Sequence, residues 1–149
     1  MLETYARMVE YSDMLAFARN GHSEADYAGF AGDRAGAEWI VELPETRVPV
    51  GYAVLTPPDL PLETRANDIE LRRIYTLSKF HGGGLGRALI GHVSDHARER
   101  GFNRLLIGVN AENDPAIGFY RRMGAEQVGT RRFQVGEALF DDLILGIAL

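Results

Sequence analysis

The sequence predicts one α/β domain in which a mixed sheet is flanked by helices. The chain has 149 residues, the size of an ordinary single domain. After a helical N-terminal part and a hairpin, segments rich in β-branched and aromatic residues alternate with segments of helical periodicity. This order is typical of a mixed α/β sheet. No repeat, low-complexity run or linker divides the chain, so we expect residues 1–149 to form a single domain.

The N-terminal part is predicted to be helical and then extended. Apolar residues at helical spacing indicate a helix over 4–19. Ser23 is a candidate N-cap for a second helix that continues to about Ala31, with acidic residues in its first turn. Residues 37–43 and 48–55 are β-rich and are separated by PETR, which predicts a hairpin.

The rest of the chain is predicted to alternate between strands and helices. Leu85, Leu89, Val93 and Ala97 recur every four residues and indicate a helix over 85–100, with Gly101 as its C-cap. The stretch TPPDLPLETRAND is polar and rich in proline, which favours a loop. The other expected elements are strands at 69–77, 104–109, 126–134 and 139–147, and a short helix over 115–123.

Composition and charge exclude several classes of function. The formal net charge is −5, which argues against a nucleic-acid-binding protein with a broad basic surface. The absence of cysteine excludes disulfides and thiolate metal sites. No apolar stretch has the length of a membrane span, and the N-terminus lacks the basic-then-apolar order of a signal peptide. We therefore expect a soluble, cytoplasmic protein without a nucleic-acid or membrane partner.

The stretch HGGGLG at 81–86 lies between a predicted strand and a predicted helix. The first amides of a helix have no partner within the helix, so this position is suited to an anion. A Walker loop would need a lysine and a Ser/Thr, and a dinucleotide fingerprint would need a third spaced glycine; both are missing. A flexible turn without a ligand is the alternative.

Two motifs together resemble those of the GNAT N-acetyltransferase family. HGGGLG is similar to the family's pyrophosphate loop, R/Q-x-x-G-x-G/A, except that His81 replaces the usual Gln or Arg. Downstream, VNAENDPAIGFYRRMGAEQVG resembles the second signature, N-x-x-A-I-x-x-Y-x-x-x-G-F/A. The positions that match the second signature are Asn113, Ala116, Ile117, Tyr120 and Gly124. The chain is identified as a member of this family from about Ala37 onward, which implies a mostly antiparallel sheet.

The resemblance implies acetyl-CoA as cosubstrate and no metal. Backbone groups of one strand would pair with the pantetheine arm, amides of the glycine loop would bind the pyrophosphate, and Asn113 would bind the arm and fix the helix that follows. The residues given these roles are Tyr75, Thr76 and Leu77 for the arm, and Gly82, Gly83, Gly84, Leu85, Gly86 and Arg87 for the pyrophosphate. A backbone N–H near Leu77 would bind the acetyl oxygen as negative charge develops on it.

The resemblance also implies two catalytic residues. Tyr120 falls on the position of the family's general acid; the alternative is a tyrosine that only packs at a helix end with its hydroxyl bonded to backbone. Glu70 is the candidate general base, acting through water, and the alternative is a surface pair with Arg72. Strict alternation places Glu70, Arg72, Ile74 and Thr76 on one face of the strand and Arg73 and Tyr75 on the other.

Other charged groups have simpler interpretations. His92 and His96 have the i, i+4 spacing of a metal site, but packing at the edge of the helix is favoured. Asp141 and Asp142 are expected to solvate a hairpin, with polyamine attraction as the alternative. The paired arginines at 121–122 and 131–132 are expected to be solvated.

The sequence therefore predicts an acetyl-CoA-dependent N-acetyltransferase that acts on a small primary amine. A polyamine is the first candidate, since FQVGEALFDDLIL resembles the ending of some GNAT polyamine acetyltransferases. A protein N-terminus or a lysine side chain is the alternative acceptor, and a non-catalytic acyl-CoA-binding module is the alternative of another class. The chain begins with residues that resemble the later part of the family's first helix, so the first strand is expected to be missing. Three explanations are open: the start is set too late, the chain is truncated, or another chain fills that sheet edge, as in a homodimer.

Overall fold

The computed structural model describes residues 23–135 and 137–149. The helix expected over 4–19 and the expected loss of the first strand lie outside these residues. The described elements are α3 (Glu24–Gly32), β1 (Ala37–Glu42), β2 (Pro49–Thr56), β3 (Asp68–Thr76), the 3-10 helix η1 (Ser78–Phe80), α4 (Leu85–Glu99), β4 (Arg104–Asn110), α5 (Asp114–Arg122), β5 (Glu126–Val135) and β6 (Ala138–Ala148).

Local sequence signals set the element boundaries. Ser23 caps α3 as predicted: its hydroxyl accepts from the Asp26 N–H at 3.2 Å, and the Asp26 carboxylate accepts from the Ser23 N–H at 2.8 Å. The predicted hairpin is confirmed as the antiparallel pair β1–β2. Helix α4 ends at Glu99 with Arg100 as its C-cap, and Gly101 follows with φ +84°, which a glycine adopts without steric cost.

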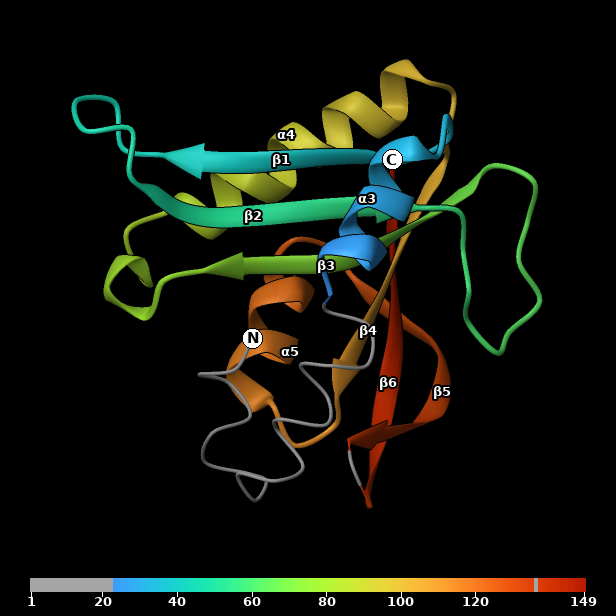
Figure 1. Ribbon diagram of the computed structural model, residues 1–149. Coiled ribbons are helices and arrows are strands. Elements are labelled where there is room, and N and C mark those ends of the chain that lie inside the picture. The colour runs from blue at the N-terminus through green and yellow to red at the C-terminus, as the bar shows by residue number, and fades with distance from the viewer. Residues whose placement is uncertain (1–22, 136) are drawn as a thin grey trace.

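The six strands form one mixed sheet in the order β1-β2-β3-β4-β6-β5. Four neighbouring pairs are antiparallel, and β3–β4 is parallel. The parallel pairing is short, because Asp68–Glu70 pair with Arg104–Leu106 and the two strands then separate. Figure 1 shows the result: β1, β2 and β3 run across the molecule, whereas β4, β6 and β5 run down it.

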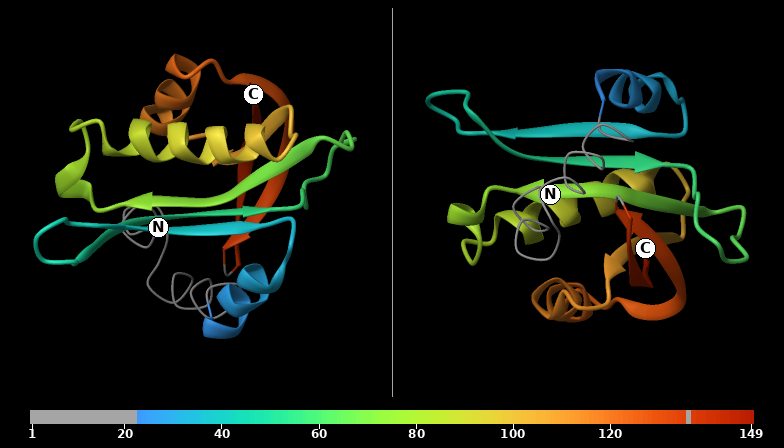
Figure 2. Two further views of the ribbon diagram at one scale, coloured as in Figure 1. Left: turned by 90° about the horizontal axis from the view of Figure 1, so that it is seen from above. Right: turned by 60° about the horizontal axis from the view of Figure 1, so that its bottom comes forward.

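Helices cover both faces of this sheet. Figure 2 shows α4 and α5 on one face and α3 on the other. Helix α4 buries the stripe Leu89, Ile90, Val93 and Ala97 against core residues of β3 and β4. Burial of each large apolar side chain in this way stabilises the folded protein by about 1.5–3 kcal/mol. Within the described residues, no helix has the length and apolar character that a membrane span requires.

A buried ion pair joins β3 to β4 at the end where these strands meet. Arg104 donates to both carboxylate oxygens of Asp68, from Nε at 2.9 Å and from Nη2 at 2.6 Å. The Asp68 side chain is 1% exposed and that of Arg104 is 16% exposed. The Arg104 guanidinium holds the pKa of Asp68 below its usual value. This ion pair therefore holds β3 and β4 together at one end, and the two strands separate toward the other end.

Candidate active site

Strand β3 has an open edge where β4 leaves it. Beyond Glu70, no described strand pairs with β3 on the side that faces β4. The Leu77 N–H donates to the Val50 carbonyl at 2.9 Å, so the backbone groups of Leu77 face β2. Because these directions alternate along a strand, those of Tyr75 also face β2, and those of Ile74 and Thr76 face the open edge.

His81 contacts this edge. Its Nε2 lies 3.0 Å from the Thr76 carbonyl oxygen, which confirms that this carbonyl does not face β2. His81 stands where family members usually carry Gln or Arg. In this chain it links the start of the glycine turn to β3, a contact that the sequence did not predict.

The glycine turn leads directly into α4. Gly82 and Gly84 have φ of +80° and +84°, and a Cβ at either position would have no atom within 4 Å. Gly84 occupies the N-cap position of α4, where it offers no side chain to cap the helix. The first bond of the helix runs from the Ala88 N–H to the Gly84 carbonyl at 2.9 Å. The N–H groups of the first turn are thus left for a ligand.

The other predicted members of the turn lie between Gly82 and the end of the first turn of α4. Gly83 is tied back by its N–H to the Phe80 carbonyl at 3.4 Å. Leu85, Gly86 and Arg87 form the first turn of α4, and Arg87 is exposed. The side chain of Arg87 can therefore add positive charge beside the first-turn amides.

The second motif builds α5. Asn113 is its N-cap: Oδ1 accepts from the Ala116 N–H at 3.3 Å, and the Asn113 carbonyl accepts from the Ile117 N–H at 3.0 Å. Its expected role in fixing this helix is confirmed. In the view of Figure 1, α5 lies in the angle between β3 and β4.

Tyr120 projects from α5 into the core and is 7% exposed. Its ring packs edge-on against Phe119, with the ring centroids 5.4 Å apart. Burial raises the pKa of Tyr120 to about 12. No described residue forms a hydrogen bond with its hydroxyl, so the alternative in which backbone holds the hydroxyl is not seen in the described part of the chain.

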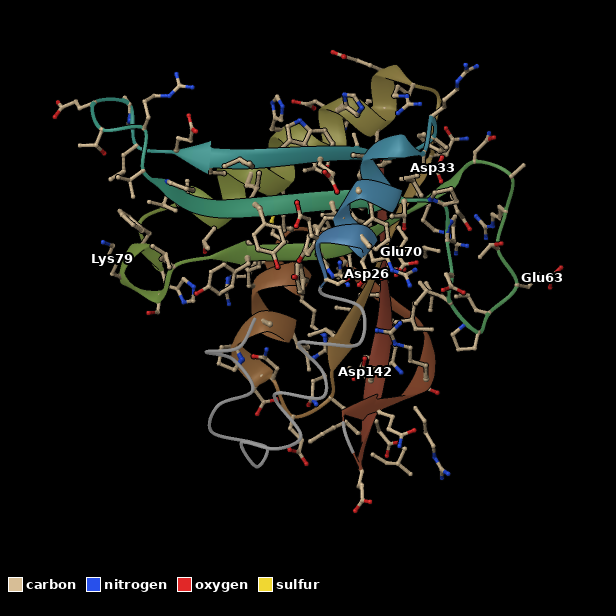
Figure 3. The ribbon with its side chains drawn as sticks, in the orientation of Figure 1. Asp26, Asp33, Glu63, Glu70, Lys79 and Asp142 are labelled. Carbon is tan, nitrogen blue, oxygen red and sulfur yellow. The ribbon has the colours of Figure 1, made fainter. Side chains whose placement is uncertain are left out.

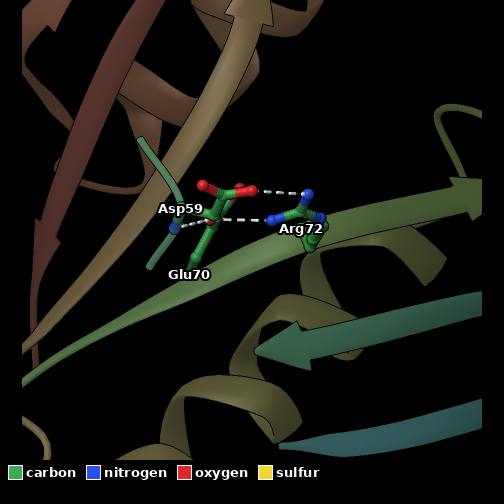
Figure 4. A network of polar contacts seen from close by, with 3 residues as sticks. All are labelled: Asp59, Glu70 and Arg72. Atoms are coloured by element: carbon green, nitrogen blue, oxygen red, sulfur yellow. Dashed lines mark hydrogen bonds and ion pairs between the residues drawn. The ribbon is translucent and has the colours of Figure 1, made fainter. Parts of the chain in front are cut away.

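Glu70 lies at the position where β3 and β4 begin to separate. Its carboxylate is buried, 3% exposed, and Oε2 accepts from the Asp59 N–H at 2.8 Å. Arg72 Nη1 lies 3.6 Å from the same oxygen, and Arg72 Nη2 donates to Asp59 Oδ2 at 3.1 Å. Figure 4 shows this network of three residues. The alternative interpretation of Glu70, a surface pair with Arg72, is thus met only in part: the pair is present, but the glutamate is buried and is also held by backbone of the 57–67 loop.

A β-bulge changes which residues of β3 share a face. Val54 pairs with Arg73 but the next residue, Leu55, pairs with Leu71, so Arg72 is an extra residue in β3. Arg72 and Arg73 both lie against α3: their guanidinium carbons are 5.8 and 4.9 Å from the centre of the Phe30 ring.

The alternation predicted for β3 is therefore wrong. Glu70 lies with Arg72 and Arg73 on the α3 face, as does Tyr75, whose ring contacts Tyr52 in the cluster beside Tyr27 of α3. Ile74 instead packs against the core on the other face.

Of the two neighbouring acidic residues in the last hairpin, one is exposed and the other is buried. Asp141 is exposed and lies 4.0 Å from Arg132, as expected for solvated groups. Asp142 is 2% exposed, and its Oδ2 accepts from Arg131 Nε at 3.1 Å, so its assignment to a solvated hairpin is wrong. Burial raises the pKa of Asp142, although the Arg131 guanidinium opposes this shift. Figure 3 shows Asp142 in the lower half of the sheet and Glu70 beside α3.

Gly108 makes room for the Arg131–Asp142 pair, which the sequence analysis missed. A Cβ at Gly108 would lie 2.7 Å from Arg131 Nη2. The guanidinium thus occupies the space that a side chain at Gly108 would fill. A glycine inside a strand was the available signal, since such a glycine often marks close approach by another group.

His92 and His96 pack around Trp39 as expected. Their ring centroids lie 5.8 and 5.0 Å from that of Trp39, both in edge-to-face geometry. Among the described residues, no group of three His, Cys, Asp or Glu side chains is placed to hold a metal ion.

Known proteins are similar to this chain in sequence. The model of the acetyltransferase (GNAT) family matches residues 6–125. An uncharacterized N-acetyltransferase of Mycobacterium tuberculosis is 35% identical over 96 residues, which cover 64% of this chain and 58% of the relative. The chain thus spans little more than half of that relative's length. Streptothricin acetyltransferase of Streptomyces lavendulae is 54% identical over 43 residues, 29% of this chain and 23% of that one.

Solved structures have the same fold. The PaiA N-acetyltransferase of Thermoplasma acidophilum in complex with coenzyme A superimposes with a TM-score of 0.74 at 15% identity, covering 99% of this chain and 84% of that one. This likeness supports the fold, and the family match includes both the glycine turn and the Asn113–Tyr120 segment. The chain belongs to the GNAT acetyltransferase family.

Proposed function

We propose that this protein is an N-acetyltransferase that moves the acetyl group of acetyl-CoA to a small primary amine. The observation that carries the proposal is the open edge of β3 next to the uncapped start of α4. An open strand edge pairs with an extended chain of amides such as pantetheine. The free amides at a helix start bind phosphate groups. The two features follow one another along the chain, as the two ends of acetyl-CoA require.

The residues present fit this cosubstrate. Ile74 and Thr76 direct their backbone groups to the open edge and would pair with the pantetheine amides. The Thr76 carbonyl already contacts His81, and its second lone pair can accept another hydrogen bond. Gly82 and Gly84 leave space for the diphosphate because they carry no side chain.

Bound acetyl-CoA would supply an activated acyl group for direct attack by the amine. A bond forms between the amine nitrogen and the carbonyl carbon, and the carbon–sulfur bond breaks with its electron pair on sulfur. Starting from its ammonium form, the acceptor loses two protons, one before the attack and one as the amide forms; the sulfur gains one proton, and the other leaves to solvent. The protein must therefore accept a proton, bind the carbonyl oxygen and return a proton.

Glu70 is proposed to accept the proton from the amine. A lysine-like ammonium has a pKa near 10.4, so it must be deprotonated before it attacks. Glu70 and Ile74 are four positions apart with the extra residue Arg72 between them, which is about 10 Å along the strand. The proton would therefore pass through water.

The other two roles belong to β3 backbone and to α5. Because the Leu77 N–H is bonded to β2, the donor that we propose for the carbonyl oxygen is the Ile74 N–H. Tyr120 is the proposed acid that returns a proton to sulfur, since its buried hydroxyl stays protonated at neutral pH.

Release of free thiol from acetyl-CoA tests the proposal. The acceptor panel contains monoamines, polyamines, aminoglycosides, amino acids and short peptides, and acetyl-CoA binding is measured separately by calorimetry. Turnover with a small amine supports the proposal, whereas turnover with peptides alone would favour a protein N-terminus or lysine as acceptor. Tight binding without any amine-dependent release would indicate a non-catalytic acyl-CoA-binding module.

A further inference from the structure

A groove on the α3 face indicates which small amine the protein takes. The groove has a volume of about 460 Å³ and crosses β1, β2 and β3. This volume lies within the range of small-molecule sites. Tyr75 and Leu77 line its β3 side. The groove thus reaches the strand whose opposite edge would hold the acetyl group.

The floor of the groove is a row of apolar and aromatic side chains. Ile40, Tyr52 and Tyr75 are neighbours across the three strands, because Ile40 pairs with Tyr52 and Tyr52 pairs with Tyr75. The Tyr52 and Tyr75 ring centroids are 6.0 Å apart, and Tyr27 of α3 adds a ring at 6.0 Å from Tyr52. Ile40 is 69% exposed, which is unusual for a large apolar side chain.

The charge of the groove argues against a polyamine. Glu38 is the one carboxylate among its described lining residues. A polyamine carries several ammonium groups along its length, and each would need an acceptor when it leaves water. An aromatic or aliphatic body would instead bury apolar surface against Ile40 and the tyrosine rings.

From this arrangement, and on the basis of the proposed function, we infer that the acceptor is a monoamine with an apolar, preferably aromatic body. The body lies on the row Ile40–Tyr52–Tyr75. Its amine points past Tyr75 to the acetyl group at the open edge of β3. The inference narrows the proposed acceptor from small primary amines to monoamines with an apolar body. Such a monoamine replaces the polyamine expected from the sequence.

Two acceptors test the inference directly. Thiol release is measured with 2-phenylethylamine and with spermidine over a range of concentrations. We expect kcat/KM to be at least about tenfold higher for 2-phenylethylamine, the factor that about 1.4 kcal/mol of lost contact would give. An equal or higher value for spermidine would overturn the inference.

A variant pair connects this preference to the groove. Ile40→Glu adds a carboxylate at an exposed position of the row, and we expect it to reduce the ratio of the two kcat/KM values at least tenfold, through KM. Val48→Glu is the matched control, because Val48 is also an exposed apolar residue, 49% accessible, but does not line the groove. If both variants change the ratio equally, the groove is not the acceptor site.

Binding separates this inference from the proposed function. Calorimetry of 2-phenylethylamine with the protein saturated by coenzyme A requires no turnover. Binding that Ile40→Glu weakens and Val48→Glu does not would support the groove even if no amine were acetylated, in which case only the proposed function fails. Absence of binding to the wild-type protein would overturn the inference, and so would loss of thermal stability in Ile40→Glu alone, because the row would then pack against another part of the chain.

Discussion

Tyr120 occupies a position that keeps its phenol protonated. Its pKa is raised to about 12 by burial, so the hydroxyl can donate a proton throughout the neutral range. We expect Tyr120→Phe to lower kcat about 100-fold, the usual scale for a lost general acid. The Kd of acetyl-CoA should change little, since the ring remains packed. Thiol release and calorimetry give the two values.

A loss of stability in Tyr120→Phe would contradict a catalytic role for the hydroxyl. Because no described residue bonds the hydroxyl, the substitution should leave the thermal unfolding temperature within about 2 °C of the wild type. A large drop in stability together with kcat would assign the hydroxyl a packing role in place of a catalytic one.

Glu70 is buried, and a backbone amide holds its carboxylate. Glu70→Gln keeps an oxygen for the Asp59 N–H and removes the group that accepts a proton. We expect kcat to fall about 100-fold at neutral pH, with partial recovery at high pH, where more of the amine is already deprotonated. Rates measured from pH 6 to 10 provide the test.

Glu63 offers a matched control for Glu70. It is exposed on the loop that carries Asp59. Glu63→Gln should leave the pH–rate profile unchanged. If it changes the profile as Glu70→Gln does, the effect arises from the loop or from net charge, and Glu70 is not the base.

At the scale of the element, the start of α4 depends on a left-handed glycine. Gly84→Ala places a Cβ at φ +84°, where an L-residue is strained by about 1–2 kcal/mol, although no atom lies within 4 Å. A change in the turn would misdirect the first-turn amides of α4. We expect the Kd of acetyl-CoA to increase at least about tenfold, the cost of roughly one lost charge-assisted hydrogen bond.

Gly91 in the same helix supplies the control for Gly84. It also has no atom within 4 Å of a Cβ, and its φ is not positive. Gly91→Ala should stabilise the protein by about 0.5–1 kcal/mol through helix propensity and leave Kd unchanged. Urea denaturation and calorimetry test both variants. Equal Kd values for wild type and Gly84→Ala would exclude the turn as the diphosphate site.

Most elements could be predicted because their signals are local. The Ser23 cap, the β1–β2 hairpin and the apolar stripe of α4 each depend on residues within one or two turns or strands. The burial of Asp142 could not be predicted in this way. It depends on Arg131 from the neighbouring strand and on the missing side chain at Gly108, and neither contact follows from the spacing of Asp142 in its own strand.

The candidate site was predicted unevenly for the same reason. The glycine turn and Asn113 are linear motifs, and the structure places them at the starts of α4 and α5. The direction of the Leu77 N–H depends on the pairing of β3 with β2, which the sequence of β3 alone does not contain. The His81 contact with Thr76 likewise requires the chain to fold back over five residues.

At the scale of the whole molecule, the Asp68–Arg104 pair joins the two halves of the sheet. Asp68→Asn would leave a largely buried guanidinium without its counter-charge, and we expect it to lower the free energy of unfolding by about 3 kcal/mol at pH 7. Urea denaturation measures this change. Asp95→Asn, at an exposed pair with Arg98, should cost less than about 1 kcal/mol.

The Asp68–Arg104 pair also makes the stability of the protein depend on pH, and the lowered pKa of Asp68 gives the direction of this dependence. The pKa of Asp68 is lowered in the folded protein, so its contribution to stability is fully present above the ordinary pKa of 3.8 and is lost as pH falls through the folded pKa. The difference in stability between wild type and Asp68→Asn should therefore shrink below about pH 4. A difference that stays constant down to pH 2 would contradict a charged pair.

The extra residue in β3 determines which change in the length of this strand the proposed active site can tolerate. Side chains of a regular strand alternate between the two faces of the sheet, and the extra residue of a bulge reverses this alternation for the residues beyond it. Glu70 and Tyr75 are an odd number of positions apart, so a regular strand would present them to opposite sides of the sheet. Deleting Arg72 would leave Glu70 and Tyr75 four positions apart in a regular strand, so both would stay on the α3 face and the base would still face the acceptor. The strand can therefore lose this one residue without turning Glu70 away from the acceptor.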